Sequence, residues 1–328
     1  MNEHYKEIDV IKGLSLISVI CAHCNSVPKG SSTFATVCSV EMSNIGTLGV
    51  ICFFVISGFL FHYNSGEFVQ FVKKKMIRLI IPWIIGATLV YLYVYLRKPP
   101  LSFYSWINFF IGNGSYFYYI SVLLFFYILF SLIPIMRNDV LLLVCVISTM
   151  IFVSCNLNDL ISPYLNPLNW IGYFAFGILL KNHSDKIKKF QMKTKLLRWI
   201  PITLYILVLI IQMMSMNYGN YWGLPDSIFC WIGSLALAII GIKMSTGRQS
   251  VITNLLVYSG KQSFFIYIWH MPIAGIVTYL TSKGFLYYFV AVRPLLIMSF
   301  TLFLSMILCK LFKKMNIENY SYIIGLRR

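Results

Sequence analysis

The sequence predicts an all-α membrane protein with about ten transmembrane helices and with both termini in the cytoplasm. Three observations predict this class. Of the 328 residues, 59% are hydrophobic and only 11% are charged, far fewer charged residues than a soluble protein of this length carries. The apolar residues form long runs, and the basic residues gather in short clusters between those runs. We therefore expect one integral-membrane domain over residues 1–328.

The runs are counted against a span of roughly 20 apolar residues. Ten runs qualify, at residues 8–24, 45–63, 79–96, 116–135, 140–154, 169–180, 196–216, 227–242, 263–281 and 285–312. The longest segments between them, 25–44 and 182–195, are predicted to be loops too short to fold alone. A further apolar run at 102–112 is too short to cross a bilayer, and we expect it to form an interfacial helix.

The basic residues alternate from loop to loop as a topology signal does. With the N-terminus inside, all but five of the 27 basic side chains fall on the cytoplasmic side. The exceptions are Lys29, Arg97, Lys98, Lys283 and Arg293. Positively charged loops stay in the cytoplasm, so this distribution supports ten spans. It also accounts for the formal net charge of +17 without a nucleic-acid partner, and the expected surroundings are membrane lipids.

The first apolar run carries an acid, a cation and an imidazole, namely Asp9, Lys12 and His23. Ionisable groups at membrane depth are costly and are functional by default. Lys12 and His23 lie eleven positions apart, which returns nearly to the same helix face, with a separation of roughly 16 Å along the axis. One face then carries a cation near one membrane surface and a titratable base towards the other. A packing role for His23 is the alternative.

Cys21 and Cys24 flank His23 in a pattern like part of a metal-ligand set. A structural zinc site needs four ligands, and no second pair of Cys or His residues completes the set. We therefore predict no metal here.

Polar side chains also occur in the last two predicted spans. Ser263, Tyr267 and His270 are spaced by four and three positions, so they share one helix face. Arg293 enters the tenth span from the outside, next to Pro294. Together with the first span, this set is suited to line a polar cavity. The alternatives are a hydrogen-bonded structural role for His270 and extension of the Arg293 side chain to the outer surface.

Three further segments have both a structural and a functional interpretation. The basic cluster at 73–78 is either a topology anchor or a site for the phosphates of a donor. The segment FFVISGF at 53–59 contains Ser57 and a glycine that permit close helix approach. Tyr118 and Tyr119 fit an interfacial aromatic belt. The basic residues of the cluster at 73–78 are Lys73, Lys74, Lys75 and Arg78.

Together these residues resemble the acyltransferase-3 family of membrane O-acyltransferases along nearly the whole chain. The specific pieces are the Asp9-Val-Ile-Lys12-Gly13 stretch, with ten residues between Lys12 and His23, and FFVISGF at 53–59. The family usually has Arg where Lys12 stands and Trp near Tyr118. Lysine keeps the charge but lacks the bidentate fork of arginine. Weaker matches are Lys75-x-x-Arg78 with Pro82, Tyr118 and Tyr119 with Pro134, and the face of Ser263, Tyr267 and His270.

The resemblance implies transfer of an acyl group, usually acetyl from acetyl-CoA, to a hydroxyl of a cell-surface or envelope polysaccharide or of a lipid-linked glycan. The expected location is the bacterial inner membrane. Lys74, Lys75 and Arg78 would bind the donor phosphates. Lys12, paired with Asp9, would hold the donor deeper. His23 would take the acceptor proton or form a short-lived acetyl-imidazole. The expected pore-lining residues are Ser57, Tyr118, Tyr119, Ser263, Tyr267, His270 and Arg293.

Two alternatives stay open at this point. A non-catalytic transporter or flippase of lipid-linked glycan shares the ten spans and a polar pore. An acyltransferase of the same fold that uses succinyl or another acyl donor would differ only in the volume of its donor pocket. The Lys12-to-His23 spacing, taken with FFVISGF, favours an acyltransferase over a transporter.

Overall fold

The computed structural model describes residues 6–24, 33–62, 68–95, 101–155, 162–184, 199–217, 227–283, 292–314 and 324–326. Every regular element in these ranges is a helix, which confirms the all-α class. The helices group into two compact units, which are described separately. Unit 1 comprises Met1–Cys52 and Gln191–Asn316, and unit 2 comprises Phe53–Phe190 and Ile317–Arg328. The expectation of one domain over the whole chain stays a prediction.

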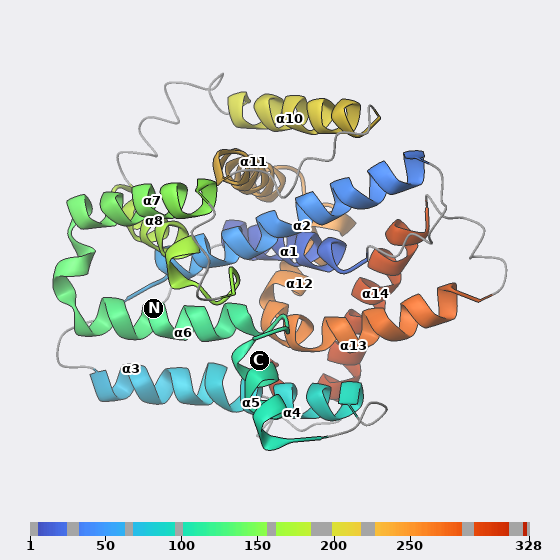
Figure 1. Cartoon of the computed structure of the whole chain (residues 1–328), viewed down its shortest axis with the longest axis horizontal. Helices are drawn as coiled ribbons and strands as arrows, with labels where there is room; N and C mark the ends of the chain where they lie inside the picture. Colours follow the sequence, from blue (N-terminus) through green and yellow to red (C-terminus); the bar gives the residue numbers. More distant parts are fainter. Residues whose placement is uncertain are drawn as a thin grey trace. The chain divides into compact units, whose positions relative to one another are not determined.

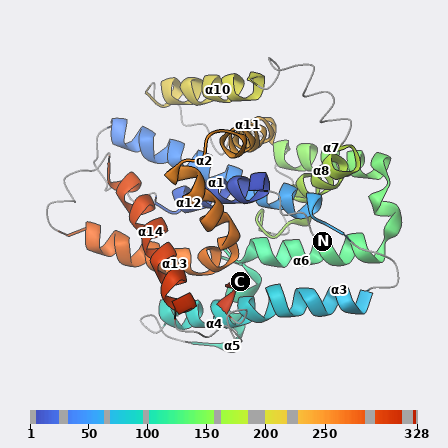
Figure 2. The ribbon, with the colours of Figure 1, turned by 180° about the vertical axis from the view of Figure 1, so that it is seen from behind.

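Unit 1 is organised around its first helix. That helix, α1, packs most extensively on α12 and also contacts α11, α13 and α14. Figures 1 and 2 show α13 and α14 side by side, with α14 crossing α13. The helices of unit 1 are α1 (Lys6–Ala22), residues 33–52 of α2 (Thr33–Phe59), α10 (Ile200–Asn217), α11 (Ser227–Thr246), α12 (Val251–Lys261), α13 (Ser263–Thr281) and α14 (Arg293–Lys314).

Glycines set the close approach of α1 and α12. A Cβ atom on Gly13 of α1 would overlap the carbonyl oxygen of Leu256 in α12. In the other direction, a Cβ on Gly260 of α12 would overlap the carbonyl oxygen of Asp9 in α1. Membrane helices gain little from the hydrophobic effect when they associate, so small residues that let backbones meet supply much of the packing energy. The two glycines therefore hold the helix of Lys12 against its neighbour.

Unit 2 contains one long helix with a local widening. Helices α3 and α4 run together through η1, a π-helical turn that lies immediately before Pro82, and Ile81 donates its N–H to the carbonyl of Met76. A proline ring crowds the carbonyl four residues earlier, here that of Arg78, and this crowding favours the wider turn. The first elements of unit 2 are α3 (Phe68–Lys75), η1 (Met76–Ile80), α4 (Ile81–Tyr95) and α5 (Phe103–Ile111).

The core of unit 2 is aromatic. Phe54, at the end of α2, lies 5.7 Å from Phe126 between ring centroids, and Phe126 lies 5.5 Å from Phe174. All three rings are fully buried. Helices α7 and α8 lie side by side in Figure 1. The remaining elements are α6 (Tyr118–Leu132), η2 (Pro134–Arg137), α7 (Asp139–Ser154), η3 (Pro167–Asn169) and α8 (Ile171–Asn182).

The short apolar run at 102–112 forms a helix, α5, as predicted. Ser102 caps it, since its hydroxyl accepts the backbone N–H of Ser105 at 3.0 Å. Gly112 ends it with a φ of 102°, a left-handed conformation that glycine adopts without strain. Phe103 and Tyr104 are both exposed. The interfacial position of α5 stays a prediction.

By length and composition, four helices in the described ranges are able to cross a membrane, or five if the bent pair α11–α12 counts as one broken span. Each of the ten predicted runs contains a helix, but ten crossings and cytoplasmic termini stay predictions. The predicted loop at 25–44 is wrong for residues 33–44, which belong to α2. The 20-residue template selected the most apolar stretch of this helix and left out its more polar first turns.

Candidate active site

Two of the predicted site residues, Asp9 and Lys12, are buried on α1. Their side chains are 6% and 9% exposed. The backbone of Asp9 lies against Gly260, so this part of α1 is enclosed by α12. Burying a carboxylate and an ammonium group is costly, and membrane helices keep such groups where they serve a function.

His23 occupies the turn directly after α1. Its backbone N–H donates to the carbonyl of Ile20 at 3.0 Å, which ties the turn to the end of the helix. The imidazole is half-buried, and its ring centroid lies 5.3 Å from that of His270, with the ring planes tilted by 46°. Unit 1 thus brings together two predicted site residues from distant parts of the chain.

His270 lies in α13 together with the other two residues of its predicted face, Ser263 and Tyr267. All three side chains are buried, and His270 has no exposed surface. Nδ1 of His270 lies 2.6 Å from the carbonyl oxygen of Tyr267, and the two rings are 5.7 Å apart. Pro272 follows within the same helix. A proline cannot donate a backbone hydrogen bond to the preceding turn, yet α13 runs as one helix from Ser263 to Thr281.

Arg293 is the first residue of α14 and is only 4% exposed. One of its terminal nitrogens donates to the carbonyl of Thr278 in α13 at 3.3 Å. The guanidinium therefore lies inside unit 1 and joins α13 to α14. The alternative that its side chain extends to the outer surface is wrong.

The sulfur atoms of the two cysteines beside His23 each contact another atom of the protein. The sulfur of Cys21 lies 3.1 Å from that of Met298, and the thiol of Cys24 donates to the carbonyl of Ile20 at 3.0 Å. Within the described part of the chain, no three His, Cys, Asp or Glu residues form a group suited to a metal ion. That the first span holds no metal stays a prediction.

The FFVISGF segment meets α6 and α8 in unit 2. Ser57 and Tyr119 share a hydrogen bond of 3.3 Å between their hydroxyl oxygens. A Cβ atom on Gly58 would overlap the carbonyl oxygen of Phe174, so α2 and α8 touch through their backbones. This contact fits the predicted packing role of the serine and the glycine in this segment.

The side chains of Tyr118 and Tyr119 pack against different residues, although the two are adjacent in the sequence. Tyr119 packs on Phe54 with ring centroids 4.8 Å apart. Tyr118 instead lies 5.0 Å from the ring of Tyr164 and 5.7 Å from that of Trp170. Both tyrosines therefore belong to the aromatic packing of unit 2. That they line a pore stays a prediction.

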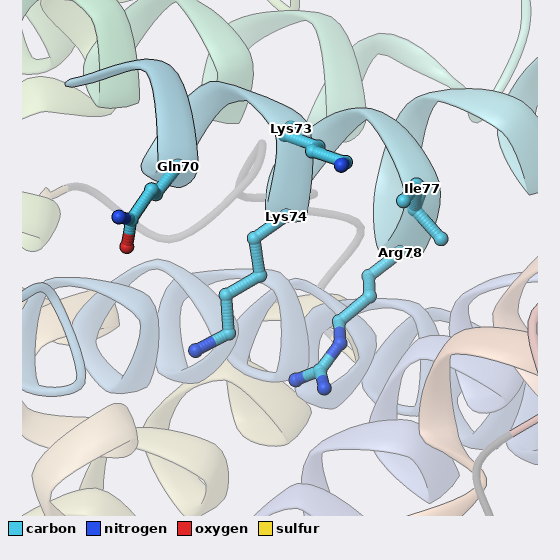
Figure 3. A pocket seen from close by; sticks show the side chains of 5 residues that line it. All are labelled: Gln70, Lys73, Lys74, Ile77 and Arg78. Atoms are coloured by element: carbon cyan, nitrogen blue, oxygen red, sulfur yellow. The ribbon is translucent and has the colours of Figure 1, made fainter. Parts of the chain in front are cut away.

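The basic cluster surrounds a cavity of about 360 Å³ on the long helix of unit 2. In Figure 3, Lys74 and Arg78 extend in the same direction from successive turns, while Lys73 points to another side. Residues four apart share a helix face, which explains the shared direction. All the cations at this cavity are exposed. Its lining consists of Gln70, Lys73, Lys74, Ile77 and Arg78.

Lys75 is separated from this cavity. Its ammonium nitrogen lies 3.5 Å from the ring centroid of Tyr127 and 5.3 Å from that of Phe71. A cation over an aromatic face is attracted by the ring quadrupole. The structure thus divides the predicted donor-binding set: Lys74 and Arg78 face one cavity together, and Lys75 is engaged with aromatic rings.

One buried acid, Glu41, escaped the prediction from sequence. It lies in α2, is 8% exposed, and neither of its carboxyl oxygens has a hydrogen-bond partner among the described residues. The sequence did contain a hint, because Glu41 lies only four residues before the apolar run at 45–63. The prediction of a loop at 25–44 meant that Glu41 was not considered as part of a buried helix.

Comparison with models of known protein families shows to which family this chain belongs. A family model described as an acyltransferase domain matches residues 5–313. Searches of curated proteins and of solved structures found no match. The family match covers nearly the whole chain, including the positions of Lys12, His23 and residues 53–59. The chain therefore belongs to the acyltransferase-3 family and is a membrane acyltransferase.

Proposed function

We propose that this protein is a multi-pass O-acetyltransferase of the bacterial inner membrane. In this proposal it moves acetyl from cytoplasmic acetyl-CoA to a hydroxyl of an envelope polysaccharide or a lipid-linked glycan, and it has ten spans with both termini cytoplasmic. One observation carries the proposal. His23 directly follows the helix that contains the buried Lys12, and its half-buried imidazole lies next to that of the fully buried His270.

His23 acts as the general base in the proposed reaction. A neutral imidazole nitrogen takes the proton of the acceptor hydroxyl while the hydroxyl oxygen attacks the thioester carbonyl. The new C–O bond forms, the C–S bond breaks, and the same proton passes from His23 to the sulfur of CoA. The products are an acetyl ester and free CoA, with no net change in protons. Partial exposure of His23 suits this role, because the base must reach a substrate.

The donor phosphates bind at the exposed cavity of unit 2. Lys74 and Arg78 point the same way there, and Gln70 adds an amide donor. Charge-assisted hydrogen bonds to phosphate are among the strong ones, and an arginine fork matches phosphate geometry. Lys12 would attract the donor deeper in the protein, and Asp9, three positions earlier on α1, would balance its charge.

The test is to replace His23 with alanine. General-base catalysis contributes typically 10²–10⁴-fold, so His23→Ala is expected to lower acetyl transfer by about that factor. Membranes that contain the native glycans would be supplied with acetyl-CoA, and both thiol release and glycan-bound acetyl would be measured. His62→Ala is the matched control, because His62 is exposed in unit 2 outside the proposed site. A folded His23→Ala protein with full activity would remove His23 from the reaction.

A further inference from the structure

His23 and His270 differ in how much of each imidazole a substrate can reach. His23 is half-buried, whereas His270 is completely buried within α13. Their ring centroids lie 5.3 Å apart with the ring planes tilted by 46°, so a rotation of the His23 side chain would bring one of its nitrogens to Nε2 of His270. The half-buried His23 can meet a substrate, whereas the fully buried His270 can act only through His23.

The hydrogen bond at Nδ1 determines the tautomer of His270. Nδ1 lies 2.6 Å from the carbonyl oxygen of Tyr267, and that oxygen can only accept. Nδ1 therefore carries the hydrogen and donates it. A neutral imidazole has one N–H, so Nε2 of His270 bears a lone pair and is an acceptor. The carbonyl of Tyr267 also fixes the orientation of the ring.

We propose that His270 is a positioning residue for His23, in which Nε2 of His270 accepts the ring N–H of His23. This rests on the proposed function above, in which His23 is the base. With one nitrogen of His23 committed as a donor to His270, its other nitrogen carries the lone pair that meets the acceptor hydroxyl. The arrangement follows the general rule that the partner of one imidazole nitrogen selects the state of the other.

The proposed pair has a definite proton balance. His23 gains the hydroxyl proton on the nitrogen that faces the acceptor and becomes an imidazolium ion, while its other N–H stays hydrogen-bonded to His270. It then returns one proton to the departing sulfur of CoA. His270 neither gains nor loses a proton, and Tyr267 keeps its hydrogen bond. The buried lone pair of His270 stabilises the imidazolium ion during the step.

Variants of His270 separate positioning from packing. His270→Leu keeps the bulk but removes the acceptor, and we expect roughly 10–100-fold lower kcat, as for other residues that orient a functional imidazole. KM for acetyl-CoA should not change. His270→Gln places an amide oxygen near the position of Nε2 and should recover part of the loss. His183→Leu, at a histidine paired with Asp139 in unit 2, is the matched control and should leave kcat unchanged.

A double variant tests whether the two histidines act as a unit. His23→Ala with His270→Leu should be no slower than His23→Ala alone, because a positioning residue has nothing left to position. Losses that multiply in the double variant, or a Gln variant as slow as the Leu variant, would overturn the proposal. If His23→Ala itself stays active, the proposed function fails instead, so the two failures are distinguishable.

A measurement on the unaltered protein detects the proposed hydrogen bond without relying on enzyme activity. With ¹⁵N-labelled histidine, a hydrogen bond from N–H to N gives a scalar coupling between the two ring nitrogens. We expect this coupling between His23 and His270, assigned by its disappearance in His23→Ala. Two imidazoles without such a coupling, or His270 protonated at Nε2, would contradict the proposal.

Discussion

In unit 1 the side chains of Asp9, Lys12, Glu41 and Arg293 are buried, whereas the cations at the cavity of unit 2 are exposed. Within the described ranges, unit 1 holds every buried Asp, Glu, Lys and Arg side chain. Unit 2 fills its interior with aromatic rings such as those of Phe54, Phe126 and Phe174.

This contrast corresponds to two different chemical requirements. Proton transfer benefits from a base held in a fixed position in surroundings that contain little water, because electrostatic interactions are stronger there. Recognition of a phosphate-bearing donor needs exposed cations, because the donor arrives hydrated from an aqueous compartment. In the proposed function, the proton-transfer step therefore belongs to unit 1 and donor recognition to unit 2.

The largest expected effect comes from the glycines that hold the helices together. Gly260→Ala would push α12 away from the backbone of Asp9, and Gly58→Ala would push α2 away from Phe174. Overpacking of this kind typically costs about 1–3 kcal/mol, so both variants should lower the midpoint of thermal unfolding in detergent. Gly260→Ala should in addition lower kcat, because it displaces the helix that carries Lys12 and His23.

A glycine without neighbours provides the control for both variants. A Cβ atom on Gly275 of α13 would meet nothing within 4 Å. Replacing a helical glycine by alanine is favourable by roughly 0.5–1 kcal/mol when no clash results, so Gly275→Ala should be neutral or slightly stabilising. If all three variants unfold at the same temperature as the native protein, the close helix contacts of both units would be wrong.

An intermediate effect is expected at the exposed cavity of unit 2. Arg78→Ala and Lys74→Ala should each raise KM for acetyl-CoA by about tenfold, since charge-assisted hydrogen bonds contribute roughly 1.5–3 kcal/mol and solvent screens part of this at an exposed site. The kcat value should change little, because these side chains bind a remote part of the donor. Steady-state rates of thiol release at varied acetyl-CoA would measure both constants.

A donor without phosphates tests whether the change in KM comes from contacts with the phosphates. S-acetyl-pantetheine carries the same thioester but lacks the phosphates of CoA, so its KM should be the same for the native protein and for both variants. Lys314→Ala removes an exposed cation that the topology prediction places on the same membrane side, and should leave KM for acetyl-CoA unchanged. Equal effects of Arg78→Ala on the two donors would show that this side chain does not bind phosphate.

The sequence was sufficient to predict the helices and the residues with unusual chemistry. Long apolar runs predicted where helices form, and the cost of ionisable groups in a membrane singled out Asp9, Lys12 and His23. It was not sufficient to predict the contact of His23 with His270. That contact depends on how α1 and α13 pack, and helix packing in membranes is determined by small residues spread over several helices.

Two features were missed for reasons of local physics. Glu41 was assigned to a loop because hydropathy averages over a window, whereas a buried face of a helix tolerates single polar residues that its neighbours enclose. Lys75 was grouped with Lys74 because both are cations in one cluster. Adjacent residues on a helix point about 100° apart, and the ammonium group of Lys75 lies over the rings of Phe71 and Tyr127 instead of at the cavity.

The smallest expected effect concerns Lys75, the cation of unit 2 that does not line the cavity. Lys75→Met keeps the length of the side chain but removes the charge over Tyr127, so it should lower the free energy of unfolding by about 0.5–1 kcal/mol. KM for acetyl-CoA should not change. Unfolding in SDS would measure the loss, and most of it should vanish in a Tyr127→Leu background, where the ring is absent. A raised KM with unchanged stability would instead return Lys75 to the donor-binding set with Lys74 and Arg78.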